Sequence, residues 1–163
     1  MEMDLKVEKI PVYMFSYRKS YYLTHPWKWI KDVWYGVKNL WHRARYGYAY
    51  VDAWNMSEAW CRMGANMMLH LAQYGQAYPG GGEFDTPEKW HDHLLDMAQR
   101  LRDCADIDWW DKNEVWDEYE KDFGNTELRY KWLKRQEELT NERDNLIKET
   151  FKIIGENFEM YWD

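Results

Sequence analysis

The sequence predicts an all-α fold: a single-domain bundle of four to five helices with an irregular aromatic amino-terminal lead. Apolar residues recur every three or four positions along most of the chain, which builds one apolar stripe on each helix. Prolines and cap-forming residues stand where these patterns begin, and glycines stand where several of them end. A chain of 163 residues, 45% of them hydrophobic, suits one domain with a real core.

The irregular lead is expected over residues 1–24, whose apolar residues alternate only weakly. At most one short strand, at residues 12–17, is indicated there. The first helix is expected over residues 26–45, because a proline at position 26 suits the first helical position. Its apolar stripe consists of Trp27, Ile30, Trp34, Val37 and Trp41.

The second helix is expected over residues 55–74. Asp52 or Asn55 can cap its start through a side-chain oxygen, and Gly75 should end it in a left-handed conformation. Its apolar stripe consists of Met56, Trp60, Met63, Met67 and Leu71.

Three further helices are expected after the glycine-rich loop at residues 79–82. They cover residues 87–105, 109–122 and 126–162, the last being a long carboxyl-terminal helix. Residues 134–145 contain a single large apolar residue, so we expect this stretch to project from the core. The third helix should bury Trp90, Leu94, Met97, Leu101 and Cys104. The last turn of the chain should dock through Phe158, Met160, Tyr161 and Trp162.

Charge is distributed unevenly along a chain whose net charge is −7. Residues 1–45 carry nine basic against four acidic residues, a net charge of +5, whereas residues 103–125 carry two against nine, a net charge of −7. The overall acidity argues against a general nucleic-acid binder, because such binding depends on neutralising phosphates with Lys and Arg.

The compartment follows from absent signals and from the cysteines. The sequence shows neither a signal peptide nor an apolar run of the ~18 residues that a membrane span needs, so we expect a cytoplasmic protein without a membrane partner. Cys61 and Cys104 form no C-x-x-C pair, which indicates small buried thiols, although a disulfide stays open.

With 12 Trp and 13 Tyr, the aromatic content exceeds the needs of a small core, which favours a binding surface or a homo-oligomer.

The most distinctive segment is residues 41–55, where arginines and tyrosines cluster between two predicted helices. Guanidinium groups beside aromatic rings can hold a phosphate while the rings stack on a base. This pattern predicts a site for an anionic nucleotide, with ligand-binding residues Arg43, Arg45, Tyr46, Tyr48, Tyr50, Asp52, Trp54 and Asn55. In the structural alternative, Arg43 or Arg45 pairs internally with Asp52 and caps the first helix. The arginine would then stack on Trp41 or Trp54.

The same segment carries a resemblance to a known family. The pattern W-x-R-x-R-Y-G-Y-A-x-x-D-x-W-N-M at residues 41–56 resembles a family of small uncharacterised proteins of phages and prophages of Gram-positive bacteria. The resemblance covers roughly residues 25–105, with a weaker match at the terminal Trp-Asp pair. It implies an accessory phage protein in the cytoplasm of a bacterial host. Common tasks of small non-enzymatic proteins there are sequestering a nucleotide immune signal and blocking a host defence protein.

A second candidate site is the acidic segment after the third predicted helix. Regularly placed carboxylates interleaved with tryptophans can imitate a nucleic-acid backbone and occupy the basic groove of a host protein. The alternative is a solvated helix face that keeps an aromatic-rich protein in solution. The predicted protein-binding residues are Asp106, Asp108, Trp109, Trp110, Asp111, Glu114, Asp117 and Glu118.

No catalytic, metal or cofactor site is predicted. His91 and His93 lie two positions apart, which places them on different faces of a helix, and EF-hand, Walker, Rossmann, H-E-x-x-H and G-x-S-x-G patterns are missing. We therefore expect a non-enzymatic phage accessory protein that acts against host defence by sequestering a nucleotide. An acidic inhibitor of a host protein and a phage structural or assembly component are the alternatives.

Overall fold

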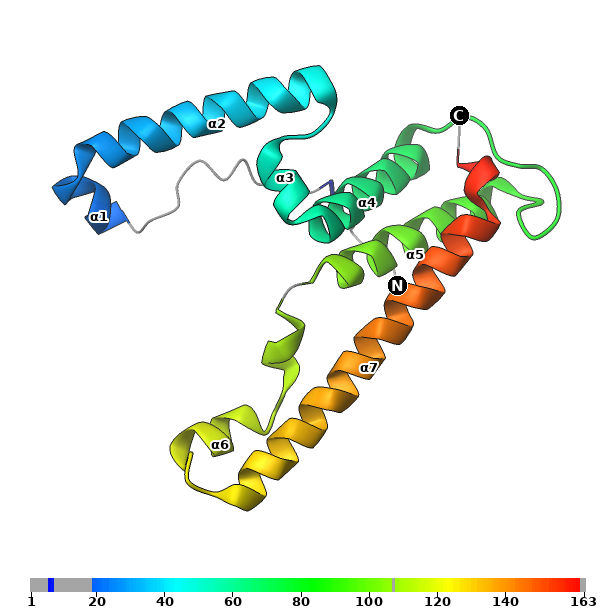
Figure 1. Cartoon of the computed structure of the whole chain (residues 1–163). Helices are drawn as coiled ribbons and strands as arrows, with labels where there is room; N and C mark the ends of the chain where they lie inside the picture. Colours follow the sequence, from blue (N-terminus) through cyan, green and yellow to red (C-terminus); the bar gives the residue numbers. More distant parts are fainter. Residues whose placement is uncertain (1–5, 8–18, 107, 162–163) are drawn as a thin grey trace. The chain divides into compact units, whose positions relative to one another are not determined.

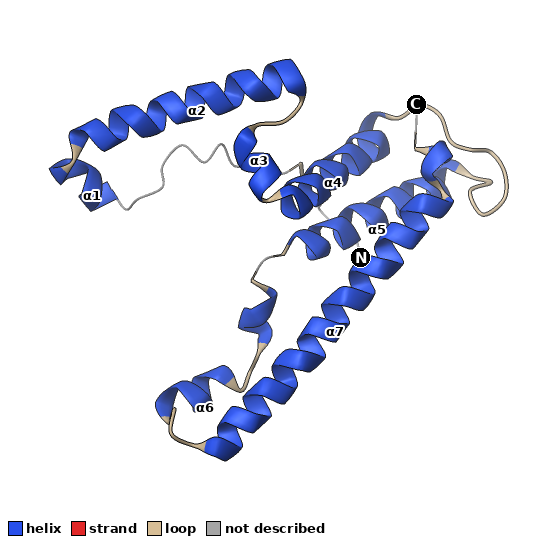
Figure 2. Ribbon diagram, viewed as in Figure 1, coloured by secondary structure: helices blue, strands red, loops and turns tan. Residues whose placement is uncertain are grey.

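The computed structural model describes residues 6–7, 19–106 and 108–161 of the chain. These residues form seven α-helices and two short 3-10 helices, and no strand occurs among them (Figure 2). An isolated bridge between Gly81 and Phe84 closes the glycine-rich loop. The predicted all-α class is confirmed, whereas the short strand predicted at residues 12–17 lies outside the described residues.

Backbone contacts divide the chain into two compact units. One, here called the amino-terminal unit, is residues 8–60, and the other, the carboxyl-terminal unit, is residues 1–7 with 61–163. The division falls inside helix α4 (Met56–Tyr74), so the two units are joined by helix rather than by an irregular linker. In the described part of the chain, none of the helices has both the length and the apolar character needed to cross a membrane.

The amino-terminal unit corrects the predicted lead. The last six residues of the range 1–24 are helical and form α1 (Lys19–Thr24), which packs on α2 (Pro26–Tyr46) (Figure 1). The hydroxyl of Tyr22 donates a hydrogen bond to the Asp32 carboxylate of α2. So short a helix has little stability of its own, and its contact with α2 therefore stabilises a conformation that the local pattern does not reveal.

The junction after α2 contains a helix that the sequence did not predict. Gly47 has a φ of 80° and ends α2 in the left-handed region, with its N–H donating to the carbonyl of Arg43 at 2.9 Å. The chain then forms α3 (Tyr50–Trp54) before α4. Of residues 46–54, which separate the first two predicted helices, only residues 47–49 are thus outside a helix.

The boundaries of α4 are close to the predicted ones, but the predicted capping interactions do not form them. Neither predicted residue caps α4 through its side chain. Asp52 lies in the first turn of α3, and Asn55, which directly precedes α4, accepts from the amide of Ala59 at 2.9 Å with its backbone carbonyl. Gly75 does end α4, but it is not among the glycines with positive φ. A Cβ at Gly75 would lie 2.5 Å from the carbonyl oxygen of Leu71, so close approach explains the glycine there.

The core of the carboxyl-terminal unit lies between α4, α5 (Pro87–Ala105) and the second half of α7 (Thr126–Glu156). The third predicted helix buries every residue expected of it, and Thr86 caps it by accepting a hydrogen bond from the amide of Lys89 at 3.3 Å. The most deeply buried core residues include Ala65, Leu69, Leu94, Met97, Ala98 and Leu101.

Most of the predicted apolar stripe of α4 does not face the core of the carboxyl-terminal unit. Met63 and Met67 are 38% and 62% exposed, and only Leu71 of the stripe packs against the core of this unit. The packed side instead carries Cys61, Ala65, Met68 and Leu69, next to Gly64. A Cβ at Gly64 would lie 3.1 Å from Leu101 of α5, so small residues let the two helices approach closely and select this side of α4.

The acidic segment folds as two short helices rather than one. η1 (Trp109–Lys112) and α6 (Trp116–Lys121) replace the helix predicted over residues 109–122, and both pack on the first half of α7. We call residues 108–140 the arm; in Figure 1 it extends along α7 beyond the end of α5. Leu146 is the first apolar residue of α7 that packs on the core, which agrees with the predicted projection of residues 134–145.

The carboxyl-terminal end docks through one residue. α7 ends at Glu156 and is followed by η2 (Phe158–Met160), so the predicted helix 126–162 is too long. Tyr161 stacks on Trp90 and makes a 2.8 Å hydrogen bond with Nε2 of His93. Burial raises the pKa of Tyr161 to about 12 and lowers the pKa of His93. Phe158 is 68% exposed and does not dock as predicted, Met160 is 37% exposed, and Trp162 lies outside the described residues.

Candidate functional site

Arg43 and Asp52 form an ion pair where α2 meets α3. The guanidinium donates from Nε to one carboxylate oxygen of Asp52 at 2.8 Å and from Nη2 to the other, which is a two-point contact. The side chains are only 17% and 11% exposed. The hydrogen bond from Arg43 is the main cause that lowers the pKa of Asp52, and the amide of Ala49 adds to it by donating at 2.7 Å.

This pair determines the structural role of Arg43. A guanidinium whose fork already holds a carboxylate cannot offer the same two donors to a phosphate. Of the structural alternative for residues 41–55, the internal pair with Asp52 is present at Arg43, whereas the arginine that lies over Trp41 is Arg45. Arg43 and Asp52 meet because of Gly47: its left-handed conformation reverses the chain, so that α3 brings Asp52 back to α2.

Arg45, unlike Arg43, lies beside aromatic rings rather than a carboxylate. Its guanidinium lies over the rings of Trp41 and Tyr46, 5.5 Å and 5.6 Å from their centroids. Within the part of the chain that the structure describes, no carboxylate pairs with it. The tyrosines at positions 48 and 50 are 59% and 70% exposed. Of the predicted ligand-binding set, Trp54 stacks edgewise on Tyr50 and Asn55 closes α3.

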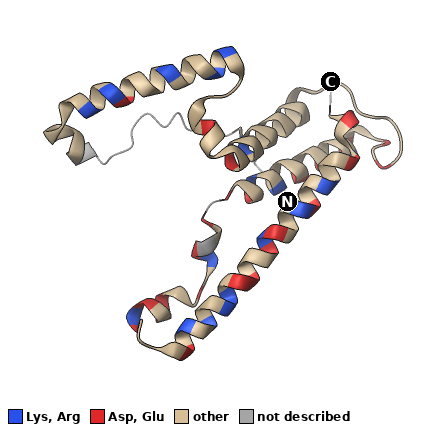
Figure 3. Ribbon diagram, in the orientation of Figure 1, with Lys and Arg blue, Asp and Glu red and all other residues tan. Residues whose placement is uncertain are grey.

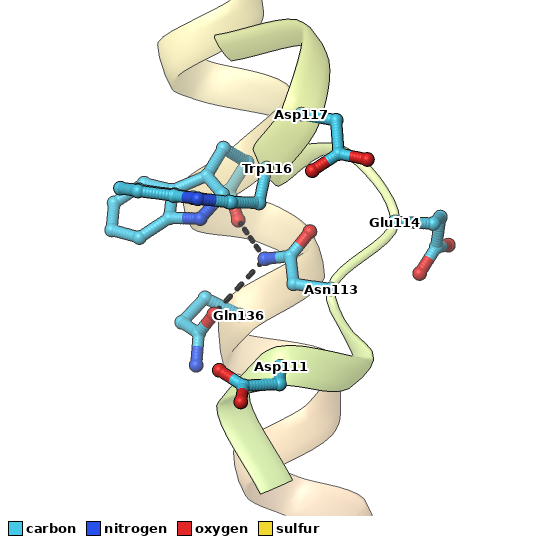
Figure 4. A pocket seen from close by; sticks show the side chains of 7 residues that line it. Asp111, Asn113, Glu114, Trp116, Asp117 and Gln136 are labelled. Atoms are coloured by element: carbon cyan, nitrogen blue, oxygen red, sulfur yellow. Dashed lines mark hydrogen bonds between the residues drawn. The ribbon is translucent and has the colours of Figure 1, made fainter. Parts of the chain in front are cut away.

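The carboxyl-terminal unit contains a pocket of about 670 Å³ in the arm. It lies where the connection between η1 and α6 crosses the first half of α7 (Figure 4). Of the predicted protein-binding residues, the fold brings three together here, and it leaves Asp106, Asp108 and Glu118 outside the lining. The pocket is lined by Asp111, Asn113, Glu114, Trp116, Asp117, Trp132 and Gln136.

Asn113 positions the pocket. Its amide nitrogen donates to the carbonyl of Trp132 at 3.2 Å and to Oε1 of Gln136 at 2.9 Å, while its side-chain oxygen accepts from the amide of Val115 at 3.1 Å. The Asn113 side chain is 3% exposed. Its hydrogen bonds hold the connection between η1 and α6 against α7, at the point where the predicted helix is interrupted. Nε2 of Gln136 is buried and has no hydrogen-bond partner among the described residues.

The three carboxylates of the pocket differ in their partners. Glu114 pairs with Arg135 at 3.1 Å, and Arg135 also contacts Glu138 and Glu142. The pKa of Glu114 is lowered, first by its own backbone N–H and then by Arg135. Asp111 and Asp117 form no ion pair with any described residue (Figure 3 shows the acidic residues of α6). Two unpaired carboxylates thus remain at the pocket.

Aromatic rings form the other side of the pocket. Trp116 is 40% exposed and its ring lies 5.8 Å from that of Trp132, on which Tyr119 stacks at 5.5 Å. Trp109 has a structural role instead, since its Nε1 donates to the carbonyl of Leu139 at 2.8 Å and Lys112 lies 3.6 Å over its ring. The side chain of Trp110 is outside what the structure describes.

Sequence reasoning missed the residues that α7 contributes to the pocket. Trp132 and Gln136 belong to the predicted carboxyl-terminal helix, and neither of them nor Asn113 is among the predicted site residues. No local sequence pattern indicates that Trp132 lies opposite Asn113. The two residues meet only because the chain turns at residues 122–125. Within the described residues, no group of three His, Cys, Asp or Glu side chains is placed to hold a metal ion. Comparison with protein-family models, curated proteins and solved structures finds no match to this chain.

Proposed function

We propose that this chain is a non-enzymatic binding protein whose arm captures a basic segment of a partner protein. The pocket that combines two unpaired carboxylates with exposed tryptophan is the observation that supports this function. A volume of about 670 Å³ lies within the range of small-molecule sites and suits one or two long side chains.

The pocket matches the chemistry of an arginine or lysine side chain. The charged head would pair with Asp111 and Asp117, and the apolar stem would lie over the ring of Trp116. The unpartnered Nε2 of Gln136 would donate to a backbone carbonyl of the bound segment. The net charge of −7 over residues 103–125 would speed the encounter with a basic partner.

The resemblance to phage proteins would make that partner a basic host protein, consistent with a counter-defence role. Nucleotide capture by the segment at residues 41–55 is less favoured, because Arg43 is held by Asp52 and leaves Arg45 to bind a phosphate without the second guanidinium. A phage structural role draws no support from either site.

The test is peptide binding by the intact protein. A fluorescent peptide of alternating arginine and glycine is titrated with the chain, and anisotropy is measured at low and high salt. Asp111→Asn with Asp117→Asn should weaken binding about tenfold at low salt, and high salt should weaken wild-type binding as well. The matched control is Asp92→Asn with Glu149→Gln, which changes the net charge equally at two exposed positions outside the pocket.

The Asp92→Asn/Glu149→Gln control shows whether the loss of binding comes from the pocket or from the change in net charge. If both double variants weaken binding equally, the pocket is not the binding site and the proposed function fails. Trp116→Ala separates the aromatic contribution, and it should raise the dissociation constant without changing the salt dependence. A salt-dependent complex recovered from host lysate by the wild type, and lost with the Asp111/Asp117 variant, would identify the natural partner.

A further inference from the structure

The apolar stripe of α2 is exposed along its whole length. Its five residues are between 49% and 68% exposed, and three of them are tryptophans. At 100° per residue they lie within an arc of roughly 80° on one side of the helix, which at 21 residues is about 32 Å long. The residues are Trp27, Ile30, Trp34, Val37 and Trp41.

The contacts inside the amino-terminal unit involve the other side of α2. Asp32 accepts the hydrogen bond from α1, Arg43 pairs with α3, and Gly36 between them is buried. These three positions lie roughly 140–180° around the helix from the centre of the stripe. Among the described residues, the contacts of α2 with the rest of its unit thus lie on its polar side while the stripe is exposed, which is the reverse of an ordinary amphipathic helix.

The charges beside the stripe are basic. Lys31, Lys38 and Arg45 lie along one edge of it, and none of them pairs with a carboxylate among the described residues. Asp32 is the sole acidic residue of α2 and already accepts from Tyr22. The blue bands along α2 in Figure 3 show this excess of basic residues.

We infer that α2 binds the surface of an anionic lipid bilayer, lying parallel to it with the tryptophan stripe inserted at the headgroup boundary. Tryptophan prefers that boundary because its ring is apolar and its N–H is polar. Lysine and arginine at the edge of an apolar face are the pattern of helices that lie in the interface of acidic membranes. A helix that lies on a bilayer needs neither a spanning segment nor a signal peptide, so the lack of both signals in the sequence, from which no membrane partner is expected, does not bear on α2.

A second copy of the chain fits this side of α2 less well. Pairing two stripes would bring Lys31, Lys38 and Arg45 of both copies together, with no free carboxylate on α2 to compensate them. An acidic bilayer supplies both the apolar layer and the negative charge that this face lacks. Charge complementarity thus favours lipid.

The experiment is flotation of the full chain with lipid vesicles, either of phosphatidylcholine alone or with phosphatidylglycerol as about a quarter of the lipid. The wild type should partition at least about tenfold more strongly to the acidic vesicles. Ile30→Ser with Trp34→Ser should lower that partition at least about tenfold. Tyr130→Ser with Phe158→Ser, at positions exposed by 70% and 68%, is the matched control and should leave partition unchanged.

A charge variant keeps the test independent of the apolar substitutions. Lys31→Gln with Lys38→Gln should lower partition to acidic vesicles and leave the weak partition to neutral vesicles unchanged, whereas Lys134→Gln with Lys148→Gln should have little effect. Circular dichroism checks that each variant keeps its helices. The inference is overturned if wild type fails to float with acidic vesicles, if it floats equally with neutral ones, or if the α2 variants float like wild type. Dimerisation that requires the stripe, without flotation, would assign this face to a second copy.

Discussion

Replacing Arg43 with alanine should destabilise the junction of α2 and α3. The substitution leaves the Asp52 carboxylate with the amide of Ala49 as its remaining partner among the hydrogen bonds described above. An ionised group that loses its partner in a largely buried position raises the free energy of the folded state more than the lost contact alone, because its desolvation is no longer offset.

The magnitude follows from the burial of the pair. Breaking a fully buried ion pair costs about 3–5 kcal/mol, and a hydrogen bond to a charged group contributes about 1.5–3 kcal/mol. Because the two side chains are 17% and 11% exposed, water reaches part of the site, and we expect a loss of about 2–3 kcal/mol. Asp52→Asn keeps the size of the side chain and should cost about 1–2 kcal/mol. The double variant should cost less than the sum of the two.

Two measurements check this expectation. Urea unfolding followed by circular dichroism gives the global change, and amide hydrogen exchange at Asp52 and Ala53, whose N–H groups donate to the carbonyl of Ala49, gives the local change. Arg45→Ala is the matched control, because it removes a neighbouring guanidinium that lies over exposed rings, at a cost of about 0.5–1 kcal/mol.

The pH dependence supplies an independent check. The folded protein holds the pKa of Asp52 below its ordinary value of 3.8, so the stabilisation is present above that value and is lost as the pH falls through the folded pKa. The difference between wild type and Asp52→Asn should therefore be constant near neutral pH and shrink below pH 3.8. An Arg43→Ala variant that unfolds and exchanges like wild type would refute the structural role of the pair. If that variant also lost nucleotide binding, Arg43 would instead be a phosphate ligand.

Two further substitutions test the arm and the carboxyl-terminal contact. Leu139→Ala, at a position 2% exposed in the half of α7 on which η1 packs, should cost about 2–4 kcal/mol and raise hydrogen exchange in η1; unchanged exchange there would show that η1 does not depend on this side chain. Tyr161→Phe removes the hydrogen bond to His93 and should cost about 1 kcal/mol in urea unfolding at neutral pH. Because burial raises the Tyr161 pKa to about 12, wild type should lose its advantage over the variant as the pH rises from 10 towards 12, and a constant difference would contradict this.

Several elements could be predicted from the sequence because local chemistry determines them. The starts of α2 and α5 follow from Pro26 and Pro87, and the break before α7 follows from Asn125, whose side chain accepts from the amides of Glu127 and Leu128. α1 could not be predicted in this way, because a helix of six residues depends on its contact with α2.

The candidate site was predictable in composition but not in geometry. The acidic segment indicated carboxylates and tryptophans in the right part of the chain, and three of its predicted residues line the pocket. Trp132 and Gln136 come from α7, and no pattern within the acidic segment points to them. Asn113 joins the two segments through hydrogen bonds to α7, so the pocket exists only after the chain has folded back on itself.

The sequence by itself determined that this protein is helical, where most of its helices begin, and how its charge is distributed. Tertiary structure alone decided which side of each helix is covered and which charged groups meet. An apolar stripe shows that a helix has an apolar face, but burial requires another element to reach that face. On α2 the described elements of its own unit reach the opposite side, and in α4 Gly64 and Ala65 direct the packing away from Met63 and Met67. Arg43 likewise has its role because a left-handed turn at Gly47 brings Asp52 to it.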